Sequence, residues 1–427
     1  MGKAVKRSYL SALVALILGL VSTGFAASPE KTAPKKRPRV VVFGVNGAEL
    51  DIIRPLLTRG ELPNLAKLIA NGVSGKLKTV DAPNCPKAYT AIETSTPPEV
   101  HGVTGFVVGG ITANTNMIKQ EPLWSILSKN GVSVGMANVP ATFPVQPVNG
   151  YMISGMLTRG NKESGCEDGV LCAPKLSQVQ GGDAVYPKAF SQELMSKVGD
   201  FYIDCARMPS REQIEGHEKE VVTTWLAQVD EIRSEQTKLF GYLLTNHPKD
   251  FTFFVQSCED RVGHWLYPIQ PFHAGYDPKV ATVNIEAFPN QYRGMDKVLG
   301  EVLKHVDDDT YVFIVSDHGI KPLRYPEPHD AHKDHAGTTP VIAKHDYEDG
   351  DEVPGTFVAM GPGIKKGVML KGLQVSVFDI APTVLHLYGL PVPKNMQGRV
   401  LTELFEGSPS KAEAAAPKAE PDHSMHN

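Results

Sequence analysis

Short apolar runs alternate with longer amphipathic segments along most of this chain. Residues 40–45, 251–255 and 311–315 are runs of β-branched and aromatic side chains, which is typical of strands buried on both faces. The segments between them repeat leucine, isoleucine or valine at helical spacing; they comprise residues 51–58, 62–71, 122–130, 210–246 and 291–305. Strands that alternate with helices predict an α/β fold with a largely parallel central sheet.

Both ends of the chain lack this alternation. Residues 1–26 contain three basic residues, an apolar run and a small-residue end at Ala26, which together predict a signal peptide. The run is short for a membrane-spanning helix, which favours a cleaved signal peptide over the alternative of an uncleaved anchor. Residues 27–38 are rich in proline and lysine and predict a linker, and residues 406–427 have the composition of a disordered tail. Residues 39–405 are therefore expected to form the folded domain of a periplasmic or secreted protein.

The charge of the chain is mildly acidic. Its formal net charge is -4, and loss of Lys3, Lys6 and Arg7 with the signal peptide would make it -7. This composition gives no indication of nucleic-acid binding. Beyond the signal peptide no stretch is long and apolar enough to span a membrane. The oligomeric state does not follow from the sequence.

Candidate metal ligands follow the predicted strands at their carboxyl ends. One strand leads into Asp317 and His318, and another is followed by Asp260 and, four residues later, His264. Residues four apart face one side of a helical turn, so Asp260 and His264 can bind one ion. Asn46 follows the first strand. Since the carboxyl ends of parallel strands meet at one edge of a sheet, these side chains are expected to converge on a site for zinc or manganese.

The order and spacing of these motifs resemble the alkaline phosphatase superfamily, most closely its type I phosphodiesterases and nucleotide pyrophosphatases. The resemblance covers residues 39–404 and rests on a series of short motifs: Asn46-Gly47, residues 60–68, Pro98-Glu-Val-His101-Gly102, residues 148–157, Asp260 with His264, Ser316-Asp317-His318-Gly319, Gly361-Pro-Gly and residues 379–391. It implies a three-layer α/β/α sandwich with inserted helical and loop segments. It also implies a hydrolase of phosphoester bonds that uses two divalent metal ions, commonly zinc.

The same resemblance assigns the metal ligands. One metal would be held by Asp260, His264 and a later histidine, for which the position shortly before the Gly361 strand favours His345 over His335. The other metal would be held by four residues: Asn46, Cys85, Asp317 and His318. Such a two-metal site orients a phosphate and stabilises the leaving oxygen.

Two of these positions depart from the family pattern. Asn46 stands where the family has aspartate, and Cys85 stands where it has the nucleophilic threonine or serine. A zinc-bound cysteine is deprotonated, so its thiolate can replace the charge that Asn46 does not provide. This exchange favours zinc over manganese or magnesium. Cys85 is therefore expected to be both a metal ligand and the catalytic nucleophile.

Conversion of Cys85 to formylglycine is not expected. Related sulfatases convert a cysteine to formylglycine within a C-x-P-x-R or C-x-A-x-R motif, but here the run is Cys85-Pro-Lys-Ala-Tyr89, with alanine one place late and Tyr89 at the arginine position. Phe106 is a further departure, because nucleotide pyrophosphatases often have an oxyanion-binding asparagine there. The histidine of the Pro98–Gly102 motif, His101, is expected to be structural.

The chain has five cysteines, and an exported protein is expected to form disulfides. Cys166 and Cys172 are close enough in sequence to form a local bridge. Cys258 lies two residues before Asp260, so a bond between Cys85 and Cys258 competes with the ligand role of Cys85. The sequence offers no evident partner for Cys205.

Two functional hypotheses follow. The first is an exported metal-dependent hydrolase that cleaves small phosphodiesters or nucleotide pyrophosphates. The second is a catalytically impaired relative that retains the fold and some metal but binds a ligand or a partner protein. The changes at Asn46 and Cys85 support the second hypothesis.

Overall fold

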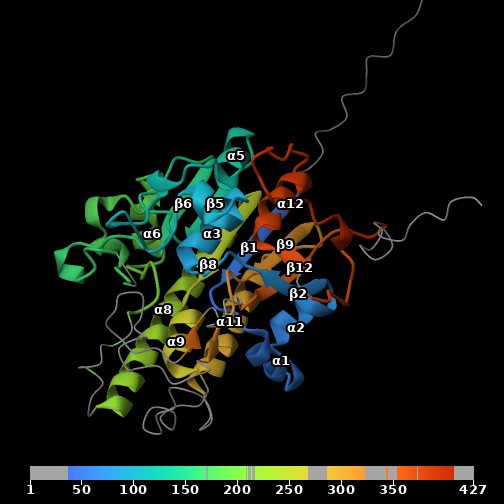
Figure 1. Cartoon of the computed structure of the whole chain (residues 1–427). Coiled ribbons are helices and arrows are strands. Elements are labelled where there is room, and N and C mark those ends of the chain that lie inside the picture. The colour runs from blue at the N-terminus through green and yellow to red at the C-terminus, as the bar shows by residue number, and fades with distance from the viewer. Residues whose placement is uncertain are drawn as a thin grey trace, which may run out of the picture. The chain divides into compact units, whose positions relative to one another are not determined.

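The first predicted strand lies in the middle of a large central sheet (Figure 1). The computed structural model describes residues 37–169, 172–207, 209, 213, 217–267, 286–322, 343–344, 353–372 and 374–407. Within these residues the sheet has ten strands. In spatial order they are β13 (Val368–Met369), β2 (Val73–Lys78), β12 (Gly355–Met360), β9 (Thr310–Val315), β1 (Arg39–Val45), β8 (Phe251–Gln256), β5 (Val134–Asn138), β6 (Gly150–Gly155) and β7 (Val185–Tyr186), with β14 (Val375–Ser376) paired to β2.

The five central strands β9, β1, β8, β5 and β6 run parallel to one another. Strand β12 joins β9 antiparallel, and β7 joins β6 antiparallel. The carboxyl ends of the five parallel strands therefore lie at one edge, as the sequence predicted. The prediction of an α/β fold with a largely parallel sheet is confirmed.

The apolar runs form strands that are buried on both faces. In β1, Val41, Phe43 and Val45 belong to the core on one side of the sheet, whereas Val40 and Val42 belong to the core on the other side. Strand side chains alternate between faces, so only a continuous apolar run can fill both cores.

Helices cover both faces of the sheet and make it the middle of three layers (Figure 1). One face carries α1 (Leu50–Thr58), α2 (Pro63–Ala70), α6 (Phe190–Lys197), α8 (Glu218–Asn246), α9 (Cys258–Leu266) and α11 (Ala287–Leu303). The other face carries α3 (Cys85–Thr94), α5 (Leu123–Lys129) and α12 (Ile380–Leu387). The short helix α4 (Pro98–His101) follows α3.

The described helices overlap the predicted segments, although most of residues 210–217 of the longest one lie outside the described residues and α8 begins at Glu218. One difference is informative. Helix α11 begins at Ala287, four residues before the predicted start, and so contains Pro289 in its first turn. The first N–H groups of a helix have no partner within the helix, so proline costs little there. Burial of Ala287 and Phe288 holds this turn against the core.

Smaller elements complete the described structure. Two short hairpins pair β3 (Val107–Val108) with β4 (Ile111–Thr112) and β10 (Lys321–Pro322) with β11 (Ala343–Lys344). Single 3-10 turns occur at Thr115–Met117, Lys162–Ser164, Leu176–Gln178, Gln180–Gly182, Val377–Asp379 and Thr402–Leu404. Among the helices in the described ranges, none has both the length and the apolar character needed to cross a membrane.

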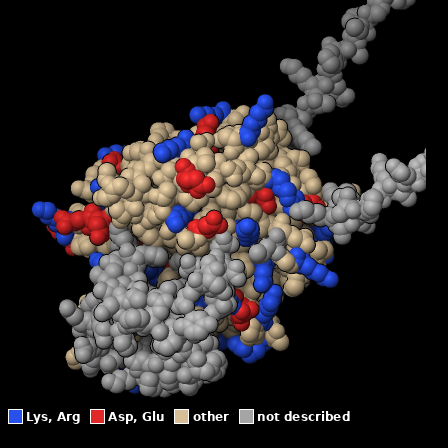
Figure 2. All heavy atoms as spheres, in the orientation of Figure 1, with Lys and Arg blue, Asp and Glu red and all other residues tan. Residues whose placement is uncertain are grey.

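The predicted bounds of the folded domain, residues 39–405, stay a prediction. The predicted signal peptide and almost all of the predicted linker and tail lie outside the described residues. On the face shown in Figure 2, basic and acidic side chains of described residues are interspersed. The expectation that the protein does not bind nucleic acid stays a prediction.

Candidate active site and metal centre

Cys85, Asp317 and His318 form a cluster that is almost completely excluded from solvent. One ligand atom from each residue lies within 4.8 Å of the other two. The Sγ atom of Cys85 is 3.6 Å from Nε2 of His318, and that nitrogen is 3.1 Å from Oδ2 of Asp317. The cluster joins the end of β9 to the start of α3.

A local signal fixes the position of Cys85. The side chain of Asn84 caps α3 by accepting a hydrogen bond of 3.2 Å from the Lys87 N–H. Pro86 occupies the first turn, where its missing N–H is tolerated. The helix therefore begins at Cys85, which places the thiol at the amino end of α3.

Helix α9 brings the second predicted pair to the same cluster. Oδ2 of Asp260 is 3.9 Å from the Cys85 sulfur, and Oδ1 of Asp260 is 3.5 Å from Nε2 of His264. Both residues are buried. The i, i+4 spacing on a helical turn thus aligns them as the sequence predicted.

The turn after β1 lies between the two aspartates. The Gly47 N–H donates to Oδ1 of Asp317 at 3.3 Å. A Cβ at Gly47 would lie 3.1 Å from the Cα and Cβ atoms of Asp260, and φ at this residue is +68°. Glycine is therefore required here for two reasons, close approach and left-handed backbone.

Asn46 is fully buried beside this turn. Its side-chain oxygen and nitrogen have no hydrogen-bond partner among the described residues. Buried amide groups are normally paired, because an unpaired one loses its hydration without compensation. The unpaired oxygen of Asn46 is available to a ligand.

The electrostatics of the cluster favour a bound cation. Burial, together with the negative charges of Asp317 and Asp260, raises the pKa of the Cys85 thiol well above its usual value. Burial by itself would lower the pKa of His318, but the two aspartates outweigh it and raise that pKa to about 9. Excess negative charge in a buried site is relieved by a proton or by a metal ion.

The side chains present fit a metal such as zinc. Thiolate, imidazole and carboxylate are the ligands that zinc prefers in proteins. Nδ1 of His318 lies 3.0 Å from the Gly319 carbonyl oxygen, a contact in which Nδ1–H donates and Nε2 is left as the ligand atom. The structure thus brings together Cys85, Asp260, His264, Asp317 and His318, with Asn46 in the adjoining turn. His345 and His335 lie outside the described residues.

The disulfides correct part of the sequence analysis. Cys166 is bonded to Cys172, as predicted. The alternative of a bond between Cys85 and Cys258 is wrong, because Cys258 is bonded to Cys205 and Cys85 is a free, buried thiol. The sequence did not indicate the partner of Cys205, because the two bonded cysteines are 53 residues apart in the chain.

A buried ion pair next to Asp260 was not predicted. The Arg261 guanidinium donates to Oδ2 of Asp204 at 2.6 Å and to the Cys205 carbonyl at 2.9 Å. Ser257 donates to the other oxygen of Asp204 at 2.6 Å. These bonds and the Cys205–Cys258 disulfide attach the start of α9 to residues 204–205, which precede α8 in the chain. They thereby fix the position of Asp260.

Tyr292 on α11, far from the first strand in sequence, also holds part of the site in place. Its hydroxyl donates to the Gly47 carbonyl at 2.8 Å and accepts from the Glu49 N–H at 3.1 Å. Because Gly47 contacts Asp317 and Asp260, Tyr292 positions the turn that separates the two carboxylates. A lone tyrosine in an amphipathic helix carries no sequence signal of this role.

Phe106 and Tyr89, two residues that differ from the patterns of related enzymes, lie in the core. Phe106 is buried in the core on the α3 side of the sheet. Tyr89, one helical turn after Cys85, is fully buried above Gly44, and its hydroxyl has no hydrogen-bond partner among the described residues. His101 is buried and its Nδ1 accepts from the Val103 N–H at 3.2 Å, which agrees with a structural role.

Residues 40–362 match the family described as type I phosphodiesterase / nucleotide pyrophosphatase. With this match and the fold, the chain belongs to that family, which is part of the alkaline phosphatase superfamily.

The similarity to individual proteins is weaker. The chain is 23% identical over 172 residues to the extracellular sulfatase SULF-1 homolog of Drosophila melanogaster, covering 40% of this chain and 14% of that protein. It is 29% identical over 128 residues to GPI ethanolamine phosphate transferase 2 of Kluyveromyces lactis, covering 30% of this chain and 16% of that protein. The chain therefore spans less than a fifth of the length of these two relatives.

A solved 2-O GAG sulfatase has the same fold. It superposes with a TM-score of 0.51 at 14% sequence identity, and the match covers 88% of this chain and 76% of that one. The family and these relatives support a superfamily hydrolase and leave open which ester is cleaved.

Proposed function

We propose that the protein is an exported, metal-dependent hydrolase of phosphoester bonds that acts on small phosphodiesters or nucleotide pyrophosphates. The observation that carries this proposal is the buried cluster of Cys85, Asp317, His318 and Asp260 in a chain of the type I phosphodiesterase family. Export rests on the signal-peptide pattern of residues 1–26.

Two divalent cations, zinc by preference, would be held by the clustered side chains. Asp260 and His264 would bind one ion together with a later histidine, His345 or His335. Asn46, Cys85, Asp317 and His318 would bind the other. The ions would supply the positive charge that lets the Cys85 thiol ionise and that polarises the phosphoryl oxygens.

Cys85 would act as the nucleophile. Its sulfur attacks phosphorus, so that a sulfur–phosphorus bond forms while the bond to the leaving oxygen breaks; the leaving oxygen takes a proton from solvent. Water then attacks the same phosphorus, the sulfur–phosphorus bond breaks, and the phosphorylated product leaves. Asp317 and His318 hold the sulfur in place, and the Gly47 N–H fixes the orientation of Asp317.

A second function is favoured by two observations: Asn46 is neutral where the family has aspartate, and the pKa of the Cys85 thiol is raised well above normal. A site with less negative charge binds metal less tightly, and without bound metal the buried thiol stays protonated. Under this alternative the protein would be a catalytically impaired relative that binds a ligand or a partner protein.

A substitution series separates the two functions. Under the first, purified protein contains about two metal ions per chain and hydrolyses bis-p-nitrophenyl phosphate. Cys85→Ala then lowers kcat/KM at least about 10³-fold while the folded state is retained. The Cys166→Ala/Cys172→Ala variant, which removes two other sulfur atoms, is the control and keeps its activity.

The opposite pattern supports the alternative. There, the parent is inactive toward phosphodiesters and nucleotide pyrophosphates, and the Asn46→Asp/Cys85→Thr variant gains a measurable diesterase rate. Because two relatives are a sulfatase and an ethanolamine phosphate transferase, p-nitrophenyl sulfate and p-nitrophenyl phosphate belong in the same assay. A preference for the sulfate ester would contradict the proposed substrate class.

A further inference from the structure

A second cavity lies at the edge of the sheet opposite the candidate metal centre. Its volume is about 310 Å³. Gly150 begins β6 and Lys249 lies just before β8, so the cavity opens at the amino ends of the parallel strands. Six strand residues of β8 rise roughly 20 Å, which separates this cavity from the cluster around Asp260.

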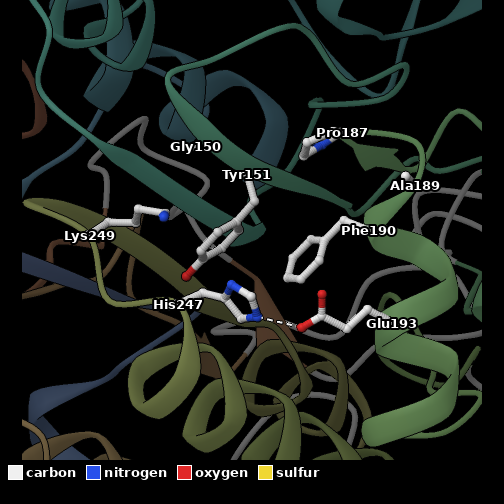
Figure 3. A pocket seen from close by; sticks show the side chains of 8 residues that line it. All are labelled: Gly150, Tyr151, Pro187, Ala189, Phe190, Glu193, His247 and Lys249. Atoms are coloured by element: carbon white, nitrogen blue, oxygen red, sulfur yellow. Dashed lines mark hydrogen bonds and ion pairs between the residues drawn. The ribbon is translucent and has the colours of Figure 1, made fainter.

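One wall of the cavity is aromatic (Figure 3). The rings of Tyr151 and Phe190 are 5.6 Å apart, and those of Phe190 and His247 are 4.7 Å apart and nearly perpendicular. The Tyr151 ring lies over Gly135 of β5, where a Cβ would come within 2.6 Å of the hydroxyl oxygen. The glycine in β5 thus makes room for the end of this ring.

Two hydrogen-bond donors, Tyr151 and Lys249, line this cavity. Tyr151 is 3% exposed, and its hydroxyl has no partner among the described residues. Lys249 places its ammonium 5.7 Å from the centre of the Tyr151 ring and forms no ion pair with a described carboxylate. A buried donor such as the Tyr151 hydroxyl normally has an acceptor, whereas Lys249 is only partly buried.

The carboxylate in the cavity does not provide that acceptor. Glu193 accepts hydrogen bonds of 2.6 Å from the Tyr242 hydroxyl and from Nε2 of His247. Figure 3 shows Glu193 directed at His247, on the far side of the ring from Lys249. Glu193 therefore orients the imidazole and leaves Lys249 and the Tyr151 hydroxyl uncommitted.

We infer that this cavity is a binding site for a small organic anion with a flat apolar body, such as an aromatic carboxylate. The aromatic wall would pack against the ring of the ligand. Lys249 and the Tyr151 hydroxyl would bind its carboxylate by charge-assisted hydrogen bonds. This site is independent of the proposed hydrolase activity, since it shares no residue with the metal cluster.

The test uses 4-fluorobenzoate as the probe and 19F NMR line broadening with the full-length protein. We expect binding with a Kd on the order of 1 mM, as for other ligands of this size with one charged contact. Two controls have the same ring, 4-fluorobenzylamine with the opposite charge and 4-fluorobenzamide with none. Both are expected to bind at least about fivefold more weakly.

Variants locate the site. Lys249→Gln and Tyr151→Phe each raise the Kd for 4-fluorobenzoate at least about fivefold, because each removes one donor. Lys297→Gln, which removes an exposed lysine of α11, leaves the Kd unchanged and is the matched control. Thermal unfolding of each variant shows that the fold is retained.

Two results would overturn the inference. One is an equal Kd for the wild type, Lys249→Gln and Tyr151→Phe. The other is binding that disappears in Asp317→Asn but is unaffected by Lys249→Gln, because it would place the carboxylate at the metal cluster. Loss of hydrolase activity in Cys85→Ala has no bearing on this test, so failure here and failure of the proposed function are distinguishable.

Discussion

The Cys85 sulfur lies 3.6 Å from Nε2 of His318, although 233 positions separate the two residues in the chain. The contact joins the first residue of α3 to His318, three residues after the end of β9. Asp260 reaches the same sulfur from α9, so three elements meet at one atom. This convergence is what makes the free thiol of Cys85 a candidate ligand and nucleophile instead of a buried apolar side chain.

Gly47→Ala should lower zinc affinity as well as stability, because the new Cβ displaces Asp260 in addition to straining the backbone. The substitution adds a Cβ at 3.1 Å from Asp260 and places alanine at φ +68°. The left-handed conformation costs about 1 kcal/mol, and displacement of Asp260 adds to it. We expect a loss of stability in urea denaturation and a several-fold loss of zinc affinity.

Gly60→Ala is the matched control for this prediction. Its φ is +74°, but a Cβ there meets no atom within 4 Å. It should lose a similar amount of stability from strain and no zinc affinity. Equal zinc affinity in the two variants would show that Gly47 does not position Asp260.

Tyr292→Phe should weaken the site without altering any ligand. The change removes a hydroxyl that bridges the Gly47 carbonyl and the Glu49 N–H, both buried. An unpaired buried group costs about 1–3 kcal/mol of unfolding free energy. Since Gly47 holds Asp317, zinc affinity measured by competition with a chelator should fall several-fold.

Tyr388→Phe serves as the comparison for Tyr292→Phe. The Tyr388 hydroxyl donates to the Asp250 carbonyl at 2.7 Å, at the start of β8 and away from the site. Its loss should reduce stability but leave zinc affinity unchanged. A fall in zinc affinity for both variants would mean that general destabilisation, not the turn at Gly47, is responsible.

Removal of the Cys205–Cys258 disulfide should cost more stability than removal of Cys166–Cys172. The first closes a loop of 53 residues and the second a loop of 6. Chain entropy predicts losses of about 4 and about 2 kcal/mol, respectively, for the paired Cys→Ser variants. Only the first loss should reduce metal binding, because Cys258 lies on α9 two residues before Asp260. Denaturation in guanidinium and metal analysis of both variants test this, and the reverse order would contradict it.

Glu93 should make the protein less stable as the pH rises from about 5 to 9. Complete burial raises its pKa from 4.5 to about 8, and the Trp124 indole N–H opposes this only in part. The folded state therefore binds the proton more tightly than the unfolded state, and stability is lost as the pH rises through 8. Relative to Glu93→Gln, the wild type should lose on the order of 4 kcal/mol between pH 5 and 9.

The comparison requires unfolding free energies of both proteins at both pH values. Glu99→Gln, which removes an exposed carboxylate from the next helix, is the control and should follow the wild type. If Glu93→Gln and the wild type have the same pH dependence, Glu93 is ionised in the folded protein and has a partner that compensates its charge.

Much of the candidate site could be predicted because its candidate ligands lie just after apolar strands. Asp317 and Asn46 follow β9 and β1, and the parallel order of those strands forces their ends together. His264 follows Asp260 at the spacing of one helical turn, which is a local property. The third histidine ligand, His345 or His335, stays a prediction because those residues lie outside the described ranges.

By itself, the sequence determined the α/β fold, the placement of the Asp/His pairs after strands and the local Cys166–Cys172 bond, because periodicity and short spacing encode them. Only the tertiary structure decided that Cys258 pairs with Cys205 and leaves Cys85 free. It also decided that Tyr292 and Arg261 position the site. These contacts join residues far apart in the chain, and their geometry depends on how helices pack on the sheet, which no local pattern specifies.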